Sequence, residues 1–312
     1  MIQIDILLSE DQIAQEFMEA LERHDLPEKF FYWFPLSIRA WINLCGDGAY
    51  RNYVRSHSVL QNHAAEIVSM LPSEPIELIS LGAGQGTKDF LIMEHLQKQG
   101  KYLNYRPVDA SQGLLEIACQ SAKDKNFACR GLKADLNNDS HLTEMQAILD
   151  EKPRLIMMLG NTLGAFDPLK FATKLDNIMR PQDFLILDGE LFNQTDTLAG
   201  YDNPINRQFA FGPLSSVGLS EPDDGRLHIK TDVDDRQAGL YRIRKHFQAS
   251  RDLKILLAGE TVQILSDTNI EMSWSYKYDR DALTGLITSS GMQLAAEYLS
   301  TDKRFLTLLV KK

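Results

Sequence analysis

The spacing of apolar and polar residues changes several times along this chain, and each change predicts a different kind of element. In residues 10–24, Ile13, Phe17 and Leu21 recur at helical spacing among acidic residues, which predicts an amphipathic helix. A segment dense in aromatic side chains follows, "LPEKFFYWFPLSIRAWINLCG", and a second helical pattern covers residues 54–70. We therefore expect residues 1–65 to form a helical N-terminal segment.

From residue 76 onwards, short apolar runs alternate with helical patterns. The runs are "IELISLGA", "NYRPVDAS", "FACRGLKADL", "RLIMMLGNT" and "DFLILDGE", and helices are expected over Thr87–Gln99, Gly113–Ala122 and Leu169–Met179. Continuous apolar strands separated by helices are typical of a parallel sheet that is covered on both faces. The pattern therefore predicts an α/β core over residues 66–189.

The alternation ends near residue 190. Residues 190–272 contain turn-forming residues and strand-like runs such as "GLYRIRKHFQA", "LKILLA" and "ETVQILS", which predict a β-rich insertion that forms a substrate domain. Residues 273–312 return to the core with a helix over Arg280–Ser290 and two strands, "QLAAEYLS" and "RFLTLLVKK". The connection "TDKR" is of hairpin length, so we expect these strands to be antiparallel. A parallel sheet that ends in such a hairpin favours the seven-stranded, Rossmann-like sheet of class I methyltransferases over a pure dinucleotide fold.

Composition narrows the classes of partner. The chain has 312 residues, a formal charge of −10 and a pI near 5.2, which argues against nucleic acid and anionic membranes as partners. Its three cysteines show no CxxC spacing, and its first residues lack the pattern of a signal peptide. No run approaches the roughly 20 apolar residues of a membrane helix. We expect a cytoplasmic protein that binds no metal and is a monomer, with a weak homodimer as the alternative.

The strand "LISL" runs into a glycine-rich turn, "GAGQGTKDF". Gly82, Gly84 and Gly86 have the spacing G-x-G-x-G, whereas the dinucleotide fingerprint G-x-G-x-x-G would need a glycine where Thr87 stands. The P-loop pattern is also absent. A tight glycine turn lets a ligand approach the backbone closely. Taken alone, this turn fits several nucleoside ligands and also a purely structural role.

Two acidic residues follow at the ends of the next strands. Asp109 ends the second strand, where a carboxylate can accept hydrogen bonds from a ribose diol. Asp135 ends the third strand, where it can receive the amine of adenine, with Leu136 beside the ring. Either residue could instead cap a helix. Together with the glycine turn, they favour a site for S-adenosylmethionine (SAM) over other nucleotide sites.

Several segments carry a resemblance to a known family. They are "EKFFYW", "SLGAGQGTKDFLIMEHL", "YRPVDASQGLL", "LIMMLGNTLGAFDP", "AGYDNPINRQF" and "MSWSYKYD". From about Lys29 to the C-terminus, the chain resembles the SAM-dependent histidine-specific methyltransferases, typified by the histidine Nα-methyltransferase of ergothioneine biosynthesis, with dimethylallyltryptophan N-methyltransferases as relatives. The resemblance implies SAM as cofactor. It also implies cofactor contacts from Tyr32, which would close over SAM, and from Gly82, Ala83, Gly84, Lys88, Asp109 and Gly160.

The resemblance also implies substrate contacts, and here the chain departs from the family. Tyr201 and Ser275 fall at substrate positions, and Tyr50 approximates a further tyrosine. The family's asparagine for the substrate α-amine is replaced by Ala165, and its glutamate falls on Ser273, with Glu271 two residues earlier. Each polar group of a buried substrate that is left unpaired costs about 1–3 kcal/mol. We therefore expect an amine acceptor, an amino acid or a derivative, other than histidine itself.

The loop "GNTLGAFDP" supplies Asn161 and Thr162 beside the expected methyl-transfer position. We expect Asn161 to replace the missing amide at Ala165, and Tyr201, Tyr50 and Glu271 to grasp the substrate; Asn161 and Tyr201 are the candidate catalytic residues. The seven histidines show no metal-ligand spacing. Two alternatives stay open: a SAM-binding protein of the same fold that has lost catalysis, and an NAD(P)-dependent oxidoreductase.

Overall fold

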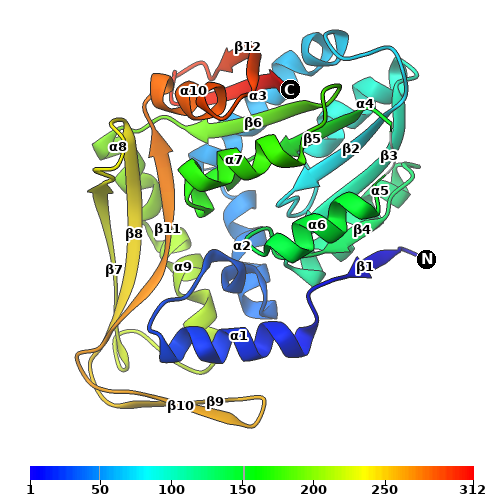
Figure 1. Ribbon diagram of the computed structural model, residues 1–312. Coiled ribbons are helices and arrows are strands. Elements are labelled where there is room, and N and C mark those ends of the chain that lie inside the picture. Colours follow the sequence, from blue (N-terminus) through cyan, green and yellow to red (C-terminus); the bar gives the residue numbers. More distant parts are fainter. Residues whose placement is uncertain (49, 150–151) are drawn as a thin grey trace.

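The computed structural model describes residues 1–48, 50–149 and 152–312 and arranges them around one large β-sheet (Figure 1). In the described part of the chain, eight strands form this sheet in the order β1-β4-β3-β2-β5-β6-β13-β12. Their bounds are Ile4–Ile6 (β1), Ile76–Leu81 (β2), Tyr102–Asp109 (β3), Gly131–Lys133 (β4), Arg154–Met158 (β5), Phe184–Glu190 (β6), Gln293–Leu299 (β12) and Phe305–Lys311 (β13).

Strand directions confirm the expected sheet and correct one detail. The strands from β4 to β6 are parallel, whereas β13 is antiparallel to both β6 and β12. The parallel sheet with a final hairpin, and with it the class I methyltransferase fold, is therefore confirmed. The expectation of seven strands is wrong by one, because Ile4–Ile6 adds an edge strand, β1, parallel to β4. Three residues are too few to show a period, so this strand gives no pattern in the sequence.

Helices cover both faces of the sheet, as the alternating pattern predicts. Helices α3, α4 and the end of α5 share one hydrophobic cluster with β2 and β3, and α6, α7 and α10 share another with β5, β6 and β13. Their bounds are Arg51–Ser69 (α3), Asp89–Lys98 (α4), Gln112–Asp124 (α5), Asp139–Ala147 (α6), Pro168–Ile178 (α7) and Arg280–Ser289 (α10). None of the helices in the described ranges has the length and apolar character that a membrane span requires.

Between β6 and α10 the chain leaves the main sheet. The segment begins with two helices, α8 (Gln194–Tyr201) and α9 (Pro204–Ser216), where the sequence pattern predicts strands. Asn193 and Asn203 explain the difference, because each asparagine side chain caps one of these helices by accepting the N–H of the residue three positions on. The β-rich part starts only after α9.

The strands that follow form a three-stranded antiparallel sheet, in the order β11-β8-β7, and a separate hairpin of β9 and β10. Their bounds are Gly225–Val233 (β7), Leu240–Ala249 (β8), Leu253–Leu257 (β9), Glu260–Ile264 (β10) and Asn269–Tyr278 (β11). Strand β11 spans residue 272, where the sequence pattern places the end of the insertion. In Figure 1 these long strands extend away from the main sheet.

The N-terminal helices pack mainly on this second layer. They are α1 (Glu10–Glu22), the short helix η1 (Glu28–Tyr32) and α2 (Pro35–Gly46). Their apolar residues share one hydrophobic cluster with α9 and with β8 to β11, and Figure 1 shows α1 crossing beneath the main sheet towards the β9–β10 hairpin. The N-terminal segment and the insertion therefore close over the main sheet together.

Candidate active site

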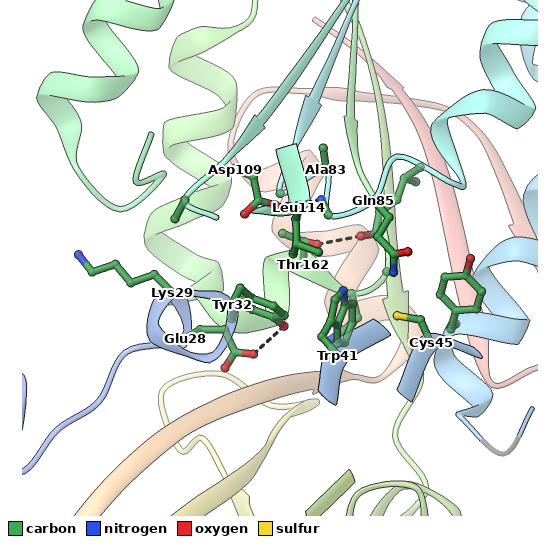
Figure 2. Close-up of a pocket in the computed structure, with 18 of the residues that line it drawn as sticks. Glu28, Lys29, Tyr32, Trp41, Cys45, Ala83, Gln85, Asp109, Leu114 and Thr162 are labelled. Carbon is green, nitrogen blue, oxygen red and sulfur yellow. Dashed lines mark hydrogen bonds between the residues drawn. The ribbon is translucent and has the colours of Figure 1, made fainter. Parts of the chain in front are cut away.

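A cavity lies between the main sheet and the antiparallel β11-β8-β7 sheet. The loops after β2, β3, β4 and β5 form one side, and side chains of η1, α2, α8, α9, β8 and β11 form the other. Figure 2 shows Tyr32 of η1 and Trp41 of α2 facing the glycine turn and Asp109. Its volume of about 250 Å³ is just below the range of roughly 300–1,000 Å³ that is usual for small-molecule sites. Because open α/β sheets bind ligands at the carboxyl ends of their parallel strands, this cavity is the candidate active site.

Every site residue predicted from the sequence, except Glu271, lines this cavity. The cofactor candidates there are Tyr32, Gly82, Ala83, Gly84, Lys88, Asp109, Asp135, Leu136 and Gly160, and the substrate candidates are Tyr50, Asn161, Thr162, Ala165, Tyr201 and Ser275. The structure thus gathers residues from the N-terminal segment, the core and the last long strand around one space.

The glycine turn after β2 has a left-handed backbone, which residues with a Cβ atom adopt only with strain. Gly82 and Gly84 have φ angles of +69° and +56°, and a Cβ on Gly82 would lie 2.6 Å from Thr162 Cγ2. At Gly84 the nearest atom to an added Cβ is Trp41 Nε1, at 3.9 Å, so that face opens into the cavity. The turn is a cradle in which a ligand can contact the backbone directly, as a SAM site requires.

Asp109 holds this cradle in place. Its Oδ2 accepts the N–H of Gly84 at 2.9 Å and its Oδ1 accepts the N–H of Ser111 at 2.9 Å. Burial raises the pKa of the Asp109 carboxyl, while these backbone N–H groups oppose the shift. A carboxylate has about four lone-pair positions, so Asp109 keeps acceptor capacity for two hydroxyl groups of a ligand.

Asp135 and Lys88 are two further charged residues that line the cavity. Asp135 accepts from Lys29 Nζ at 2.6 Å and from the N–H of Asn137 at 2.8 Å, so its carboxylate is already paired when it faces the cavity. Lys88 crosses to the turn after β5, where a Cβ on Gly160 would collide with the Lys88 ammonium. An ammonium group in this position suits the carboxylate of an amino-acid ligand.

An aromatic wall faces the glycine turn. The Tyr32 and Trp41 rings meet edge to face with centroids 5.2 Å apart, and Phe209 lies 5.4 Å from Tyr32 and 5.2 Å from Trp41. The Tyr50 ring extends the wall at 5.9 Å from Trp41. The sequence motifs indicate Tyr32 and Tyr50, whereas Trp41, which lies outside the segments that carry the family resemblance, and Phe209, which ends the segment "AGYDNPINRQF", were missed.

Polar side chains of α8 and β11 meet at another part of the wall, where Tyr201 and Ser275 line the cavity. Lys277 Nζ donates to Tyr201 Oη and to Ser275 Oγ, both at 2.7 Å, and lies 3.2 Å from Glu190. Burial disfavours the Lys277 charge, but Tyr201 and Glu190 outweigh it and raise the pKa of Lys277. Burial raises the pKa of Tyr201 despite this lysine, so Tyr201 is a neutral phenol near neutral pH.

Asn161 joins the two sheets at this wall. It has a left-handed φ of +62° and is 5% exposed. Its Nδ2 donates to Ser275 Oγ at 3.2 Å and to the Tyr276 carbonyl at 3.1 Å, and its Oδ1 accepts the N–H of Glu190 at 3.0 Å. Both amide protons are therefore engaged within the protein, which favours a positioning role over direct capture of the substrate amine.

Glu271 is placed wrongly by the sequence reasoning. Its side chain pairs with Arg244 at 2.8 Å outside the cavity, and its backbone pairs with Leu26 and His24. A β-bulge between Glu271 and Trp274 gives Ser273 a φ of +65° and turns its hydroxyl towards Glu28, whose carboxylate accepts from it. A carboxylate from η1 therefore stands beside the position where the family has its own glutamate.

Two charged residues of the cavity walls, Glu28 and Lys245, were missed. The buried Lys277, which donates to the cavity residues Tyr201 and Ser275, was missed as well. Glu28 and Lys277 belong to quoted motifs, "EKFFYW" and "MSWSYKYD". Lys245 lies between Ile243 and Phe247 on the buried face of β8. A lysine at an inward position of an alternating strand is a pattern that could have identified it. Among the described residues, no group of three or more His, Cys, Asp or Glu side chains is arranged to hold a metal ion.

Comparison with known proteins identifies relatives. The chain is 24% identical over 265 residues to ergothioneine biosynthesis protein 1 of Neurospora crassa, covering 81% of this chain and 29% of that protein. It is 28% identical over 166 residues to the histidine N-alpha-methyltransferase of Mycobacterium tuberculosis (51% and 50% covered) and 23% identical over 261 residues to the 4-dimethylallyltryptophan N-methyltransferase easF of Aspergillus fumigatus (78% and 77%). This chain thus spans less than a third of the Neurospora protein and half of the mycobacterial one.

Solved structures and a family model complete the comparison. Magnesium protoporphyrin IX methyltransferase (ChlM) from Synechocystis, with bound SAH, shares 11% identity and a TM-score of 0.47, covering 91% of this chain and 96% of that one. An S-adenosylmethionine-dependent methyltransferase from Clostridium acetobutylicum shares 14% identity and a TM-score of 0.43 (83% and 91% covered). The family described as "Histidine-specific methyltransferase, SAM-dependent" matches residues 11–312. The resemblance carried by the sequence motifs is thus confirmed, and the chain belongs to the family of SAM-dependent histidine-specific methyltransferases.

Proposed function

We propose that this protein transfers a methyl group from SAM to a nitrogen atom of a small-molecule amine, an amino acid or an amino-acid derivative. The observation that carries the proposal is the cradle after β2, where Asp109 holds the Gly84 N–H and the open face of the turn lines the cavity. Asp109 has free acceptor positions for the ribose hydroxyls, Leu136 offers an apolar surface for adenine, and Lys88 offers a cation for the carboxylate.

When bound, SAM supplies an electrophilic methyl group that an amine lone pair attacks in line. The residues of this chain have to place a neutral amine at the methyl group and exclude water. The aromatic wall of Tyr32, Trp41 and Phe209 covers the cradle and excludes water from it. Tyr201, a neutral phenol held by Lys277, and Ser275, held by Asn161, provide fixed oxygen atoms that orient the acceptor.

The acceptor that we propose is not histidine. Ala165 cannot hydrogen-bond the substrate amine through its side chain, and Ser273 replaces the family's carboxylate. Glu28 places a negative charge beside Ser273, but it comes from η1 and not from β11. A changed set of polar groups selects a different polar substrate, because a buried group without its partner costs about 1–3 kcal/mol.

Two measurements test this function. Calorimetric titration should give saturable binding of SAM and none of NADH, which separates the methyltransferase from the oxidoreductase alternative. Incubation with labelled SAM and a panel of amino acids and amines should then give a methylated amine and S-adenosylhomocysteine (SAH). Binding of SAM without methylation of any amine would support the catalytically inactive alternative and contradict the proposal.

Asn161 provides a test of the substrate wall. Because its amide holds Ser275 and connects β11 to β6, we expect Asn161→Ala to lower turnover by roughly tenfold or more, the effect of removing a positioning group. The SAM dissociation constant should change little, since the glycine cradle does not depend on this amide. Full turnover with intact SAM binding would remove Asn161 from the proposed mechanism.

We also propose that the protein works in the cytoplasm as a monomer with small-molecule partners only. Cys45, Cys119 and Cys129 are free thiols, although the sulfur atoms of Cys119 and Cys129 lie only 3.4 Å apart, which supports a reducing compartment. Light scattering after gel filtration should give a mass near 35.4 kDa. A mass of twice that value would show the homodimer instead.

A further inference from the structure

Lys245 presents a buried ammonium group to the cavity. The residue is 3% exposed and lines the cavity wall from β8. Its Nζ lies 3.8 Å from Glu28 Oε2, which is within ion-pair range but beyond the hydrogen-bond distance of about 3.2 Å. The nearest aromatic ring is Phe31, whose centroid is 4.6 Å from Nζ. The three N–H donors of the ammonium thus have no acceptor at hydrogen-bond distance among the described residues.

Glu28 does not depend on this lysine for its own hydrogen bonds. Its Oε1 accepts from Tyr32 Oη at 3.0 Å, and its Oε2 accepts from Ser273 Oγ. A purely structural ion pair would bring the two charged groups into hydrogen-bond contact, because a buried pair offsets its desolvation only with good geometry. The longer separation instead leaves Lys245 free to donate into the cavity.

A buried, weakly paired ammonium is costly for the folded protein. Burial lowers the pKa of Lys245, Lys277 on β11 lowers it further, and Glu28 on η1 opposes the shift. An apolar side chain in the same place would avoid the desolvation penalty of a buried charge. The lysine is therefore better explained by a ligand acceptor than by the packing of the protein.

The position of Lys245 defines which part of the substrate it meets. Ser273 and Ser275 are alternate residues of β11, and Ser275 contacts Asn161 and Tyr201 at the end of the cavity near the β5 loop. Ser273 contacts Glu28, which pairs with Lys245. On β8, Lys245 is two residues from Ile243, the register partner of Ser275. Alternate residues of a strand are about 6.5–7 Å apart, so a substrate that reaches from Ser275 to Lys245 carries its second group several bonds from the reacting amine.

We propose that Lys245 binds an anionic oxygen at the far end of the acceptor, so that the enzyme selects amines that carry a second, distal carboxylate. This inference rests on the proposed function, because the reacting amine is placed at the Asn161 end. It adds a specificity determinant that is distinct from the SAM cradle. Glu28 orients the lysine and rejects carboxylates that approach from its own side.

The test measures binding, so that it does not depend on turnover. Two sets of probes with matched skeletons are titrated into the SAH complex by calorimetry: L-glutamate, L-glutamine and L-lysine, and the 4-carboxy, 4-carbamoyl and 4-aminomethyl derivatives of L-phenylalanine. In at least one set, the carboxylate should bind roughly tenfold or more tightly than its amide, as expected for a charge-assisted hydrogen bond. The preference is a property of the unaltered protein and needs no variant.

Two variants assign the preference to Lys245. Lys245→Met should reduce the acid-to-amide ratio to below about twofold while SAH binding stays intact. Arg244→Met is the matched control, because Arg244 immediately precedes Lys245 on β8 but pairs with Glu271 outside the cavity. It should keep the tenfold preference. If Lys245→Met does not fold, the acid-to-amide preference of the unaltered protein decides the question.

The outcomes separate this inference from the proposed function. Equal binding of acid and amide, tighter binding of the cationic probes, or no binding of any carboxylate would overturn the role of Lys245, even if the panel of amines is methylated. Tighter binding of the cationic probes would assign the distal site to Glu28 instead. A carboxylate preference without methyl transfer to any amine would support the Lys245 site and contradict the function.

Discussion

The glycine turn gives the most direct test of the structure, through Gly82→Ala. Gly82 has a φ of +69°, where an L-residue with a Cβ costs about 1–2 kcal/mol. The added Cβ would lie 2.6 Å from Thr162 Cγ2, so Thr162 must rotate. Rotation breaks the 2.8 Å bond from Thr162 Oγ1 to the Leu159 carbonyl, at a cost of about 1 kcal/mol. Alanine also restricts the unfolded chain, which returns about 0.4–1 kcal/mol. The net destabilisation should be about 1–2.5 kcal/mol.

Equilibrium unfolding in guanidinium chloride, followed by circular dichroism, measures this loss. A double-mutant cycle with Thr162→Ser separates its two causes, because serine lacks the Cγ2 atom that meets the new Cβ and keeps the hydroxyl. The double variant should be about 1 kcal/mol more stable than the sum of the two single changes predicts. The cost of placing alanine in a left-handed backbone should remain. Gly285→Ala in α10 is the control, since its Cβ meets no atom within 4 Å, and it should stabilise the protein by about 0.5–1 kcal/mol.

Two results would refute this reasoning. If the Gly82→Ala protein unfolds at the same guanidinium chloride concentration as the unaltered protein, the turn does not require glycine at this position. If Thr162→Ser recovers nothing, the β5 loop does not pack on the turn as the structure describes. SAH binding by the same variants then shows whether the cofactor site, as well as the fold, requires a residue without a side chain at position 82.

Three further changes test other parts of the structure. Asp183→Ala should destabilise the protein by about 3–5 kcal/mol in denaturant, because it leaves the buried Arg154 guanidinium, now paired at 2.9 Å, without its carboxylate; a loss below 1 kcal/mol would contradict this ion pair. Burial raises the pKa of Asp89 from 3.8 to about 6, so the folded state holds this proton to higher pH than the unfolded chain. Stability relative to Asp89→Asn should therefore fall by about 3 kcal/mol as the pH rises from about 4 to 6 and stay constant above; a flat difference would exclude the shift. Asp109→Asn should weaken SAH binding at least tenfold by calorimetry, about 1.4 kcal/mol; an unchanged dissociation constant would remove Asp109 from the cofactor site.

The parts of the fold that sequence reasoning predicted have local causes. The strands from β2 to β6 lie in short apolar runs, and α4, α5 and α7 have their own periodicity, so these elements are visible within about ten residues. Helix α6 was not predicted. Residues at the ends of consecutive parallel strands necessarily lie at one edge of the sheet. The order of elements along the chain is therefore sufficient to place the cradle and Asp109 together.

The errors have causes that act over longer distances or through single capping residues. The β-rich pattern after residue 190 gave no indication of α8 and α9, because a capping asparagine decides a helix start more than average composition does. Strand β1 exists only because β4 offers a free edge, where the N–H of Gly131 bonds to the Gln3 carbonyl at 2.9 Å. Neither cause is visible in the hydrophobic pattern.

The substrate side of the cavity shows most clearly the difference between what local sequence predicts and what depends on long-range packing. The sequence by itself determined the core sheet, the glycine turn and the acids of the cofactor side, because these follow from element order and strand ends. Only the tertiary structure decided that Glu271 does not line the cavity, that the Ser273 hydroxyl turns towards Glu28, and that Glu28 and Lys245 meet at the cavity wall. The physical reason is that one bulge reverses the direction of a side chain, and that η1, β8 and β11 are brought together by packing and not by any spacing along the chain.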